Sequence, residues 1–342
     1  MVTAAHGVTL NSDYAELRRR IAARRLLDRQ PAFYGRAIGA TLALTGLGVA
    51  ALALSPFLWT HALVGALLGL ATGRLALLLH DGAHRQIWPA GRRSDAFCLV
   101  VGPLLVGISA SWWKQKHDRH HAHPNDEHLD PDLQIAVLAF TDAQARRTPW
   151  LFRPIARYQA YLLPVLVLFE GMQLRLASAK YLATSRGRYR RTEIALISAH
   201  VVGYVALVVA TVGLTGALIV IPVHQALFGL YAGSLFAPNH KGMPIVDGSR
   251  RWSFLEQQVL TARNVRAHWL VDWWFGGLNY QIEHHLFPKL PRNRLREAQP
   301  VVRSFCAERG IPYHETGLWD SYRQSLRSMH AASSPLRSRS AA

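Results

Sequence analysis

The chain has very little cysteine for its length. Only two cysteines occur among 342 residues, Cys98 and Cys306, and they lie far apart in apolar contexts. A disulfide framework and a cysteine-rich metal site are therefore excluded. An iron–sulfur cluster needs about four thiolates, so a cluster that carries electrons to this chain would have to sit on another protein.

Acidic residues are also scarce, at 21 against 39 lysines and arginines, and the formal net charge is +18. Proteins with such an excess of basic residues often bind nucleic acid, but this chain has no zinc-finger, helix-turn-helix or aromatic stacking motif. The basic residues instead flank apolar runs, where they mark the cytoplasmic side of a membrane and attract anionic lipid. We therefore expect membrane lipids, and no nucleic acid, as partners.

The N-terminal segment lacks the apolar core of a signal peptide. Residues 12–29 contain six arginines and predict a basic amphipathic helix, either solvated or lying on the membrane surface. Arginines beside a first span favour the cytoplasmic side. We expect residues 1–32 to form a basic cytoplasmic segment and the first span to anchor the chain.

Two long stretches contain no Asp, Glu, Lys or Arg, residues 37–73 and 194–239. About twenty apolar helical residues cross the ~30 Å core of a bilayer, so each stretch with its flanks is long enough for a hairpin of two spans. The breaks are expected at Ser55-Pro56 and at Gly213-Leu-Thr-Gly216. The predicted spans are 33–55, 58–80, 194–213 and 216–238.

Two other apolar segments are not predicted to cross. Residues 96–110 are too short, and Gly102-Pro103 interrupts them, which indicates an interfacial or re-entrant segment. Residues 156–177 carry Arg157, Glu170 and Arg175, and a very basic loop follows. A full span there would place this loop outside, against the positive-inside tendency, so we expect the segment to lie on the membrane surface.

These patterns predict one all-α integral membrane domain over residues 33–325. It would have four transmembrane helices in two hairpins, interfacial helices, and a cytoplasmic helical cap. The cap is the polar, tryptophan-rich region that begins at residue 241, and residues 326–342 are expected to be a disordered tail. An even number of spans leaves both termini of this multi-pass protein in the cytoplasm.

Histidines gather at the ends of the apolar runs. Eight of the seventeen histidines form four clusters: His80 and His84; His117, His120 and His121; His240; and His284 with His285. A neutral imidazole is the commonest protein ligand for a transition metal, and eight of them suit two ions better than one. The predicted topology places all four clusters at the cytoplasmic face, where the cap would hold the metal site.

The spacing within the clusters suits ligands on one helical face. His80 and His84 are four residues apart, and His117, His120 and His121 follow an i, i+3, i+4 pattern. The zinc-protease motif would need Glu directly after the first histidine, but Asp81 stands there. Asp81 could orient a ligand or simply be solvated at the end of a helix.

Several polar neighbours of the clusters have open roles. Gln281 takes the first place of a second H-x-x-H-H spacing, where it could ligate weakly through oxygen or hydrogen-bond a ligand. Glu283 is expected to support a ligand or to face solvent. His123 and His128 flank a segment that Pro124 keeps from being helical, so they are expected to be loop histidines and not ligands.

The motifs resemble those of the membrane fatty-acid desaturase family. The resemblance rests on HDGAH from His80, on HDRHH from His117 with PN and Asp130-Pro-Asp132 after it, on NH at 239–240, and on GGLNYQIEHHLFP from Gly276. It covers about residues 75–295. The Q-x-x-H-H form resembles the branch of front-end, linoleoyl-CoA-type desaturases and related bacterial acyl desaturases.

The resemblance implies an oxygen-dependent enzyme that inserts a cis double bond into an acyl chain carried by CoA or by a lipid. It implies two iron ions, with these histidines as ligands: His80, His84, His117, His120, His121, His240, His284 and His285. It also implies O2 as co-substrate, a separate electron donor of ferredoxin or cytochrome b5 type with its reductase, and a bacterial plasma membrane. The His-Pro-Gly-Gly motif of a fused haem carrier does not occur.

The chain departs from the pattern of the eukaryotic acyl-CoA enzymes at two places. Gln281 replaces a histidine, and Phe236 stands where those enzymes hold a water with an asparagine. Whether Gln281, Asn239 and Asn264 ligate a metal or support its ligands therefore stays open.

Other functions remain to be distinguished. A hydroxylase or acetylenase could use the same irons. In a membrane-surface scaffold the histidines would have no chemical role. A metal transporter would bury ionisable residues in the middle of its spans, whereas these clusters lie at the span ends. Basic residues near the predicted interface are candidates for binding a phosphate-bearing head group or for anchoring: Lys114, Lys116, Arg119, Lys241, Arg263 and Arg266.

Overall fold

The computed structural model describes residues 2–337, with side chains from residue 13 onward. The described chain is helical apart from one pair of short parallel strands, which confirms the all-α prediction. It divides into two compact units. The membrane unit comprises Arg29–Gln115 and Pro164–Ser234, and the cap unit comprises Met1–Asp28, Lys116–Leu163 and Leu235–Ala342.

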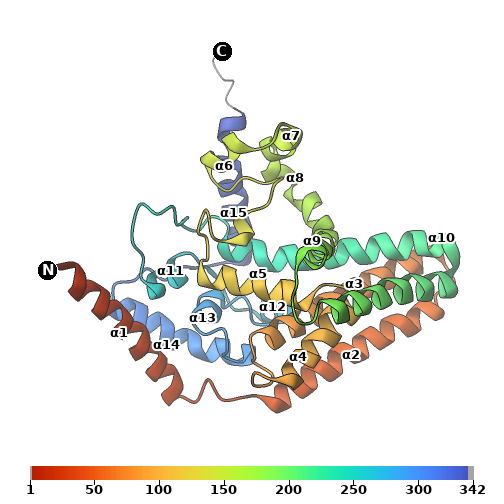
Figure 1. Ribbon diagram of the computed structural model, residues 1–342, viewed down its shortest axis with the longest axis horizontal. Coiled ribbons are helices and arrows are strands. Elements are labelled where there is room, and N and C mark those ends of the chain that lie inside the picture. Colours follow the sequence, from red (N-terminus) through yellow and green to blue (C-terminus); the bar gives the residue numbers. More distant parts are fainter. Residues whose placement is uncertain (1, 338–342) are drawn as a thin grey trace. The chain divides into compact units, whose positions relative to one another are not determined.

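The membrane unit is built from long apolar helices (Figure 1). Its own elements are α2 (Pro31–Ala53), α3 (Leu58–Ala83), α4 (Arg92–Leu99), the π-helical turn η1 (Val100–Val106), the 3-10 turn η4 (Val167–Phe169) and α9 (Glu170–Thr184). Three helices run on from one unit into the other: α5 (Ala110–Ala122), α8 (Gln159–Leu166) and α10 (Arg190–His240).

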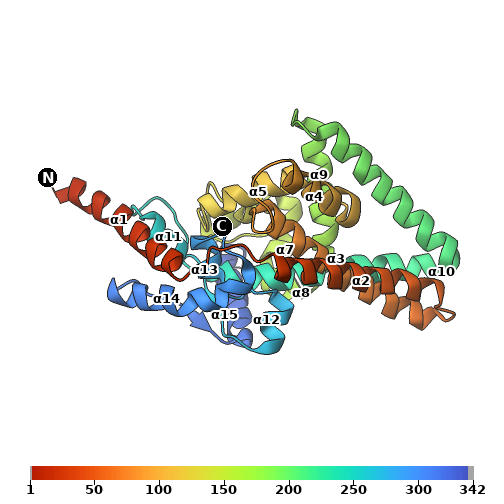
Figure 2. The same cartoon turned by 90° about the horizontal axis from the view of Figure 1, so that it is seen from below.

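Helices α2 and α3 form the first predicted hairpin. They lie side by side in both views (Figures 1 and 2), and the chain between them contains the Ser55-Pro56 break. Nε2 of the His61 ring lies 3.0 Å from the backbone oxygen of Ser55, which ties the turn to the first residues of α3. The predicted spans 33–55 and 58–80 agree with these helices to within three residues at each end.

The second predicted break also occurs where the sequence placed it. Gly213 has φ 67° and ψ −179°, a backbone conformation that only glycine adopts readily, and it interrupts α10. Figure 2 shows the two arms of this helix meeting at a sharp bend. Both arms are long enough to cross a bilayer at ~1.5 Å per residue.

Four helical stretches are long and apolar enough to span a membrane: Pro31–Ala53, Leu58–Ala83, Gln159–Thr184 and Arg190–His240. Gln159–Thr184 differs from the expectation that residues 156–177 lie on the surface. Its few charges stay within what a span tolerates, and it exposes large apolar side chains such as Leu176, which is 64% exposed.

The segment predicted to be interfacial or re-entrant is a broken helix. Helix α4 runs into η1, which contains Pro103, and the chain then bends sharply before α5. Gly107 makes this bend at φ 79°, and a Cβ atom there would lie 2.5 Å from the His200 ring. Glycine is therefore required at this position for its backbone conformation and for space.

Buried polar groups connect the helices of the membrane unit. The carboxylate of Glu193 is fully buried and accepts hydrogen bonds from the hydroxyls of Ser109 and Ser111 and from the Ser111 amide. It thereby caps the start of α5, whose first amides have no partner within the helix. His224 bridges the Thr72 and Tyr204 hydroxyls at 2.8 Å each, which joins α3 to both arms of α10.

The cap unit consists of short helices around its own core. Its elements are α1 (Val2–Ala23), η2 (Pro131–Leu133), α6 (Asp142–Arg147), η3 (Trp150–Phe152), α7 (Arg153–Arg157), α11 (Phe254–Leu260), β1 (Asn264–Val265), α12 (Trp269–Phe275), α13 (Gln281–Leu286), η5 (Arg292–Arg294), α14 (Leu295–Glu308), β2 (Glu315–Thr316), α15 (Leu318–Ala332) and η6 (Ser334–Leu336). Strands β1 and β2 pair in parallel.

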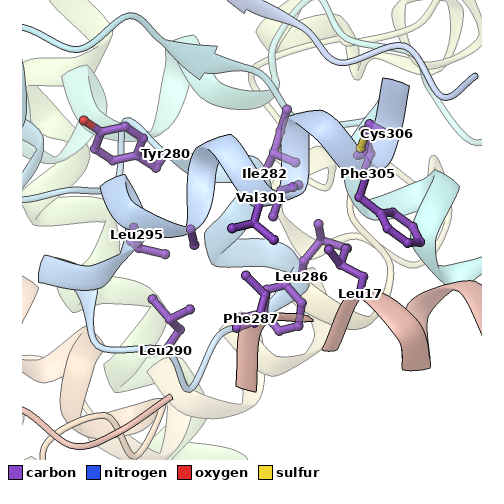
Figure 3. Close-up of a cluster of buried hydrophobic side chains, with 14 of the residues drawn as sticks. Leu17, Tyr280, Ile282, Leu286, Phe287, Leu290, Leu295, Val301, Phe305 and Cys306 are labelled. Atoms are coloured by element: carbon purple, nitrogen blue, oxygen red, sulfur yellow. The ribbon is translucent and has the colours of Figure 1, made fainter. Parts of the chain in front are cut away.

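The core of the cap unit surrounds α13 (Figure 3). Leu286 and Phe287 pack with Leu17 from α1 and with Val301 and Phe305 from α14, whose apolar residues recur every three or four positions. The Tyr14 hydroxyl donates to the Leu286 carbonyl at 2.9 Å. The basic N-terminal helix is thus not fully solvated, because Leu17 and Ile21 are buried in this core.

The C-terminal region is more ordered than predicted. Helix α15 continues to Ala332 and η6 follows, so residues 326–336 are not the disordered tail that their composition suggested. Ser325 and Met329 are buried along one face of α15. The prediction of disorder rested on the Ser- and Arg-rich composition of the end and not on this amphipathic pattern. The part of the predicted tail at 338–342 lies outside the described residues.

Candidate metal centre

Two short helices of the cap unit carry most of the clustered histidines. Helix α5 presents His117, His120 and His121 on one face, and α13 presents His284 and His285. Gly276 ends α12, and Gly276 and Gly277 both turn the chain with positive φ shortly before α13; the Arg292 carbonyl lies 2.9 Å from where a Gly277 Cβ would be. The glycine pair therefore allows a tight approach that places α13 in the core.

Three histidines from three helices converge in the cap unit. Ring nitrogens of His120, His240 and His285 lie within 4.8 Å of one another, and all three residues are buried. The ring centroids are 4.7 Å apart for His120 and His240, 4.7 Å for His240 and His285, and 5.0 Å for His120 and His285. This cluster is called the anchored triad below.

Each ring of the anchored triad is held through its Nδ1 atom. Nδ1 of His120 lies 3.0 Å from both carboxylate oxygens of Asp130, that of His240 lies 3.0 Å from the Thr261 carbonyl oxygen, and that of His285 lies 3.0 Å from Gln258 Oε1. Each of these partners provides an oxygen that accepts a hydrogen bond. Such a partner favours the tautomer with its proton on Nδ1, so Nε2 of His285 is left for a ligand role, whereas Nε2 of His240 lies 3.0 Å from Gln281 Nε2.

The donor set fits a transition metal. His285 Nε2 is buried and has no hydrogen-bond partner among the described residues, although its ring is fixed from the other side. Burial and the neighbouring histidines hold the pKa of His285 well below its ordinary value, so the ring stays neutral, the form that binds metal. A buried lone pair that faces two other imidazoles is expected of a metal ligand.

A second cluster lies beside the anchored triad. His117, His121 and His284 also have ring nitrogens within 4.8 Å of one another, and the Nε2 atoms of His117 and His121 are 3.2 Å apart. Two nitrogens at ~2.0–2.1 Å from one ion and 90° apart would be about 3 Å from each other. The rings of His121 and His285 stack at 4.3 Å, so the two clusters adjoin.

The first histidine pair belongs to the membrane unit and is described by itself. His80 and His84 are both buried at the end of α3, with ring centroids 4.7 Å apart. Asp81 is fully buried, and its Oδ1 lies 3.2 Å from His80 Nδ1. Of the two roles predicted for Asp81, solvation at the helix end is therefore wrong, and contact with a histidine is observed.

Gln281 is oriented by Asn239. The Asn239 amide nitrogen donates to the backbone carbonyls of Leu235 and Leu278, and it also donates to Gln281 Oε1 at 3.0 Å. This fixes the Gln281 oxygen toward Asn239 and leaves its Nε2 3.0 Å from His240 Nε2. In this arrangement Gln281 hydrogen-bonds a histidine, and Asn239 supports Gln281.

Asn264 and Glu283 hold α13 to the rest of the cap unit. Asn264 donates to Glu283 Oε2 at 2.7 Å and accepts from the Ile282 amide at 2.9 Å, and the Tyr313 hydroxyl donates to Glu283 Oε1 at 2.7 Å. Burial raises the pKa of the Glu283 carboxyl, and the bonds from Asn264 and Tyr313 offset part of this cost. Glu283 is thus internal, and the surface role allowed by the sequence is wrong.

A third grouping, His120 with Asp130 and Asp132, resembles a metal site but supports the anchored triad instead. Asp130 uses both oxygens on His120 and accepts the amides of Asn125 and Asp132. Burial disfavours ionisation of Asp132, but the charges of Lys116 and Lys241 and the hydrogen bond from Lys116 outweigh it and lower its pKa. Each carboxylate is therefore already compensated by the protein.

Other sequence predictions have mixed outcomes. His123 and His128 belong to none of the metal-holding groups among the described residues, in line with their assignment to a loop. Lys116 forms an ion pair with Asp132, and Lys241 donates to the Asp132 carbonyl. Arg263 is fully buried, so it cannot meet a phosphate-bearing head group, and that expectation is wrong.

The sequence assigned no role to Asp130, Gln258 or Thr261. Asp130 was visible in the Asp130-Pro-Asp132 motif, but nothing in that motif says which histidine it meets. Gln258 and Thr261 carry no sequence signal, because Gln258 contributes a common side chain and Thr261 contributes only its carbonyl.

The fold and the site define a helical membrane protein with histidine clusters able to hold metal ions. The profile of the fatty acid desaturase family, "Fatty acid desaturase", matches residues 57–317, and the chain belongs to this family. Similar proteins include the acyl-lipid (9-3)-desaturase of Physcomitrium patens, 26% identical over 90% of this chain and 60% of its own length.

Two animal relatives are similar to the same extent. The Delta(5) fatty acid desaturase of Caenorhabditis elegans is 29% identical over 91% of this chain and 72% of its own length. Fatty acid desaturase 3 of Bos taurus is 27% identical over 89% of this chain and 69% of its own length. The chain thus spans between about three fifths and three quarters of these relatives.

Proposed function

We propose that the protein is a fatty acyl desaturase in which eight histidines hold two iron ions and O2 is the co-substrate. The observation that supports this best is the anchored triad, whose three rings are each held through Nδ1 and have ring nitrogens within 4.8 Å of one another. Family membership supports iron as the metal and an acyl chain as the substrate.

The reaction removes two hydrogens from neighbouring methylenes. The acyl chain, O2, two electrons and two protons give the cis alkene and two molecules of water. Two iron ions supply, when bound, the oxidising chemistry for this step, which acid–base side chains cannot provide. The protein's part is to hold the imidazole rings in place and to exclude water from the site.

The assignment of His80 and His84 to the same centre rests on the family motif HDGAH. Their burial and the contact of Asp81 with His80 support a ligand role for the pair, since a carboxylate on Nδ1 is a common support of a metal-bound histidine. The proposed ligands are thus the two adjoining clusters of the cap unit and this pair.

We further propose that the acyl chain arrives on CoA or on a membrane lipid, and that electrons come from a ferredoxin or cytochrome b5-type donor. The two cysteines, Cys98 and Cys306, are both buried and far too few to hold an iron–sulfur cluster. The proposed location is a bacterial plasma membrane with both chain ends in the cytoplasm, which the basic flanks of the spans support.

Metal analysis of purified, folded protein tests the proposal directly. We expect two iron ions per chain by elemental analysis after anaerobic reconstitution. His120→Ala should lower this number, whereas the matched control His128→Ala, at an exposed histidine, should leave it unchanged. A folded wild-type chain that binds no iron contradicts the proposal.

Product analysis tests the reaction itself. The chain is expressed in a host that has a suitable reductase, and the fatty acids are profiled by mass spectrometry. We expect a new double bond that depends on His120 and on oxygen. A new hydroxy fatty acid would instead identify a hydroxylase, and an unchanged profile with iron-loaded protein would count against desaturation.

A further inference from the structure

Arg263 is a buried arginine with no acidic partner. Its side chain is fully buried, and no carboxylate is among its hydrogen-bond partners in the described part of the chain. An unpaired charge in the interior is costly unless many acceptors replace water. Burial lowers the pKa of Arg263 to about 10, so the guanidinium is still charged at neutral pH.

The acceptors that replace water are at the end of α10 and on α15. Arg263 donates to the carbonyls of Pro238 and Lys241, at 2.7 and 2.9 Å, and to Gln324 Oε1 at 2.7 Å. It also reaches the Ser321 carbonyl and the Ser325 hydroxyl. Because the carbonyl end of a helix carries partial negative charge, the α10 terminus compensates the guanidinium in place of a carboxylate.

His240 is the last residue of α10, so the same contacts position a histidine of the anchored triad. The last carbonyls of a helix have no partner within it. Here the Pro238 carbonyl is bound by the Arg263 side chain, the Asn239 carbonyl by the Arg263 amide at 2.8 Å, and the His240 carbonyl by Asn125 Nδ2 at 3.1 Å. The helix end that carries His240 is therefore held by Arg263 and Asn125.

The residues next to Arg263 hold the other parts of the triad. The Thr261 carbonyl accepts from His240 Nδ1 and from Asn125 Nδ2, and Asn125 is joined to Asp130, the partner of His120. Asn264 binds α13, which carries His285. Segment 261–264 is thus bonded to His240, to Asn125, which in turn bonds the partner of His120, and to the helix that carries His285, and Arg263 bonds this segment to α15.

We propose that Arg263 is a positioning residue that couples α15 to the anchored triad, so that the C-terminal helix sets the geometry of the metal ligand His240. This inference rests on the proposed metal-binding function. Helix α15 lies beyond the residues that the family profile matches, which end at residue 317.

The test measures cobalt binding by the full chain in detergent, with Arg263→Lys as the variant. Lysine keeps the charge but cannot donate to both the α10 terminus and α15 in the fork geometry of a guanidinium. Co(II) is titrated against a competing chelator and followed by its visible absorption. The matched control is Arg266→Lys, because the Arg266 side chain is exposed just beyond Arg263.

We expect Arg263→Lys to bind one Co(II) with wild-type affinity and the other about 10–100-fold more weakly, with an altered absorption spectrum for the weaker site. The control should match the wild type in both. Ser325→Ala removes one acceptor of Arg263 and should shift the same site in the same direction by a smaller factor. It serves as the readout if Arg263→Lys does not fold.

Two outcomes overturn the inference and are distinguishable. If the folded variants bind both Co(II) ions as the wild type does, even with a lower unfolding temperature, Arg263 is only structural. If the wild-type chain itself binds no Co(II), the proposed metal-binding function fails, and the inference fails with it.

Discussion

The two units use buried polar side chains for different purposes. In the cap unit, Asp130 and Gln258 each hold one histidine ring through its Nδ1 atom, and the two rings they hold, His120 and His285, lie 5.0 Å apart. In the membrane unit, Glu193 and His224 join one helix to another, and their contacts end within the network. The same types of bond thus orient ligands in one unit and hold helices together in the other.

The surroundings explain part of this difference. The membrane unit exposes large apolar side chains such as Trp59, Val202 and Leu218, which are 65–69% exposed and suit contact with lipid. Helices in lipid gain little from apolar burial against one another, so small residues and polar contacts hold them together. In the cap unit an apolar core around α13 provides that stability, which leaves its buried polar groups for positioning.

The largest effect is expected from removing a ring of the anchored triad. His285→Ala deletes a fixed, buried Nε2 and should lower metal affinity and activity by about 100-fold or more. His123→Ala is the matched control, since this loop histidine joins no metal-holding group among the described residues. Iron content and turnover are measured for both, and equal loss in the two variants would break the assignment of the triad.

A smaller effect is expected from removing a support of the triad. Asp130→Asn keeps the shape of the side chain but removes the charge that holds the His120 ring, so iron affinity should fall about 10–100-fold. Chelator competition measures it, with Asp118→Asn on the exposed side of α5 as control. Wild-type affinity in Asp130→Asn would show that the carboxylate does not position His120.

The corresponding change in the membrane unit should act on stability instead. Glu193→Gln puts an amide donor where three hydrogen bonds are now accepted, and we expect a loss of about 1–3 kcal/mol in the free energy of unfolding. Thermal unfolding in detergent measures it, with exposed Thr192→Ala as control. A fall in metal affinity at unchanged stability would contradict the view that Glu193 serves only to hold helices together.

The smallest effect is expected at the exposed contact of α1 with α14. Glu16 is bound by Arg20 and Arg309, and the Arg20 bond holds the pKa of Glu16 below its ordinary value. Its contribution is therefore present above the unfolded-state pKa of about 4.3 and is lost as the pH falls through the lower folded-state value.

Wild type and Glu16→Gln are compared by unfolding temperature between pH 6 and pH 3. The wild type should lose more stability than the variant below about pH 4.5, and added salt should narrow the gap at neutral pH. A gap that is independent of pH would show that the ion pairs do not help to hold α1.

The sequence predicted the features that local pattern determines. Uncharged stretches located the α2–α3 hairpin and both arms of α10, and Gly213 located the break between them, because bilayer thickness and glycine conformation act on a few neighbouring residues. Histidine spacing likewise identified the clusters, since i, i+3 and i+4 positions share a helical face whatever surrounds them.

The rest depends on contacts between distant parts of the chain. The bond from His240 to the Thr261 carbonyl leaves no trace in residue type, because any residue could provide that carbonyl. Arg263 was expected to meet phosphate, since an arginine near a predicted interface gives no sign that the carbonyl end of a helix compensates its charge. Helix α15 was hidden by the Ser- and Arg-rich composition of its end.

The order of synthesis gives the Arg263 contacts one more consequence. The acceptors on α15 follow every ligand from His80 to His285 in the chain, so the ribosome adds them after all the ligands. During translation, every histidine can therefore emerge before the end of α10 has its full set of bonds. A chain that is cut short after the last ligand would keep the bonds from Thr261 and Asn125 to His240 but lack those that join Arg263 and the end of α10 to α15, so under the proposed coupling we expect it to bind metal more weakly.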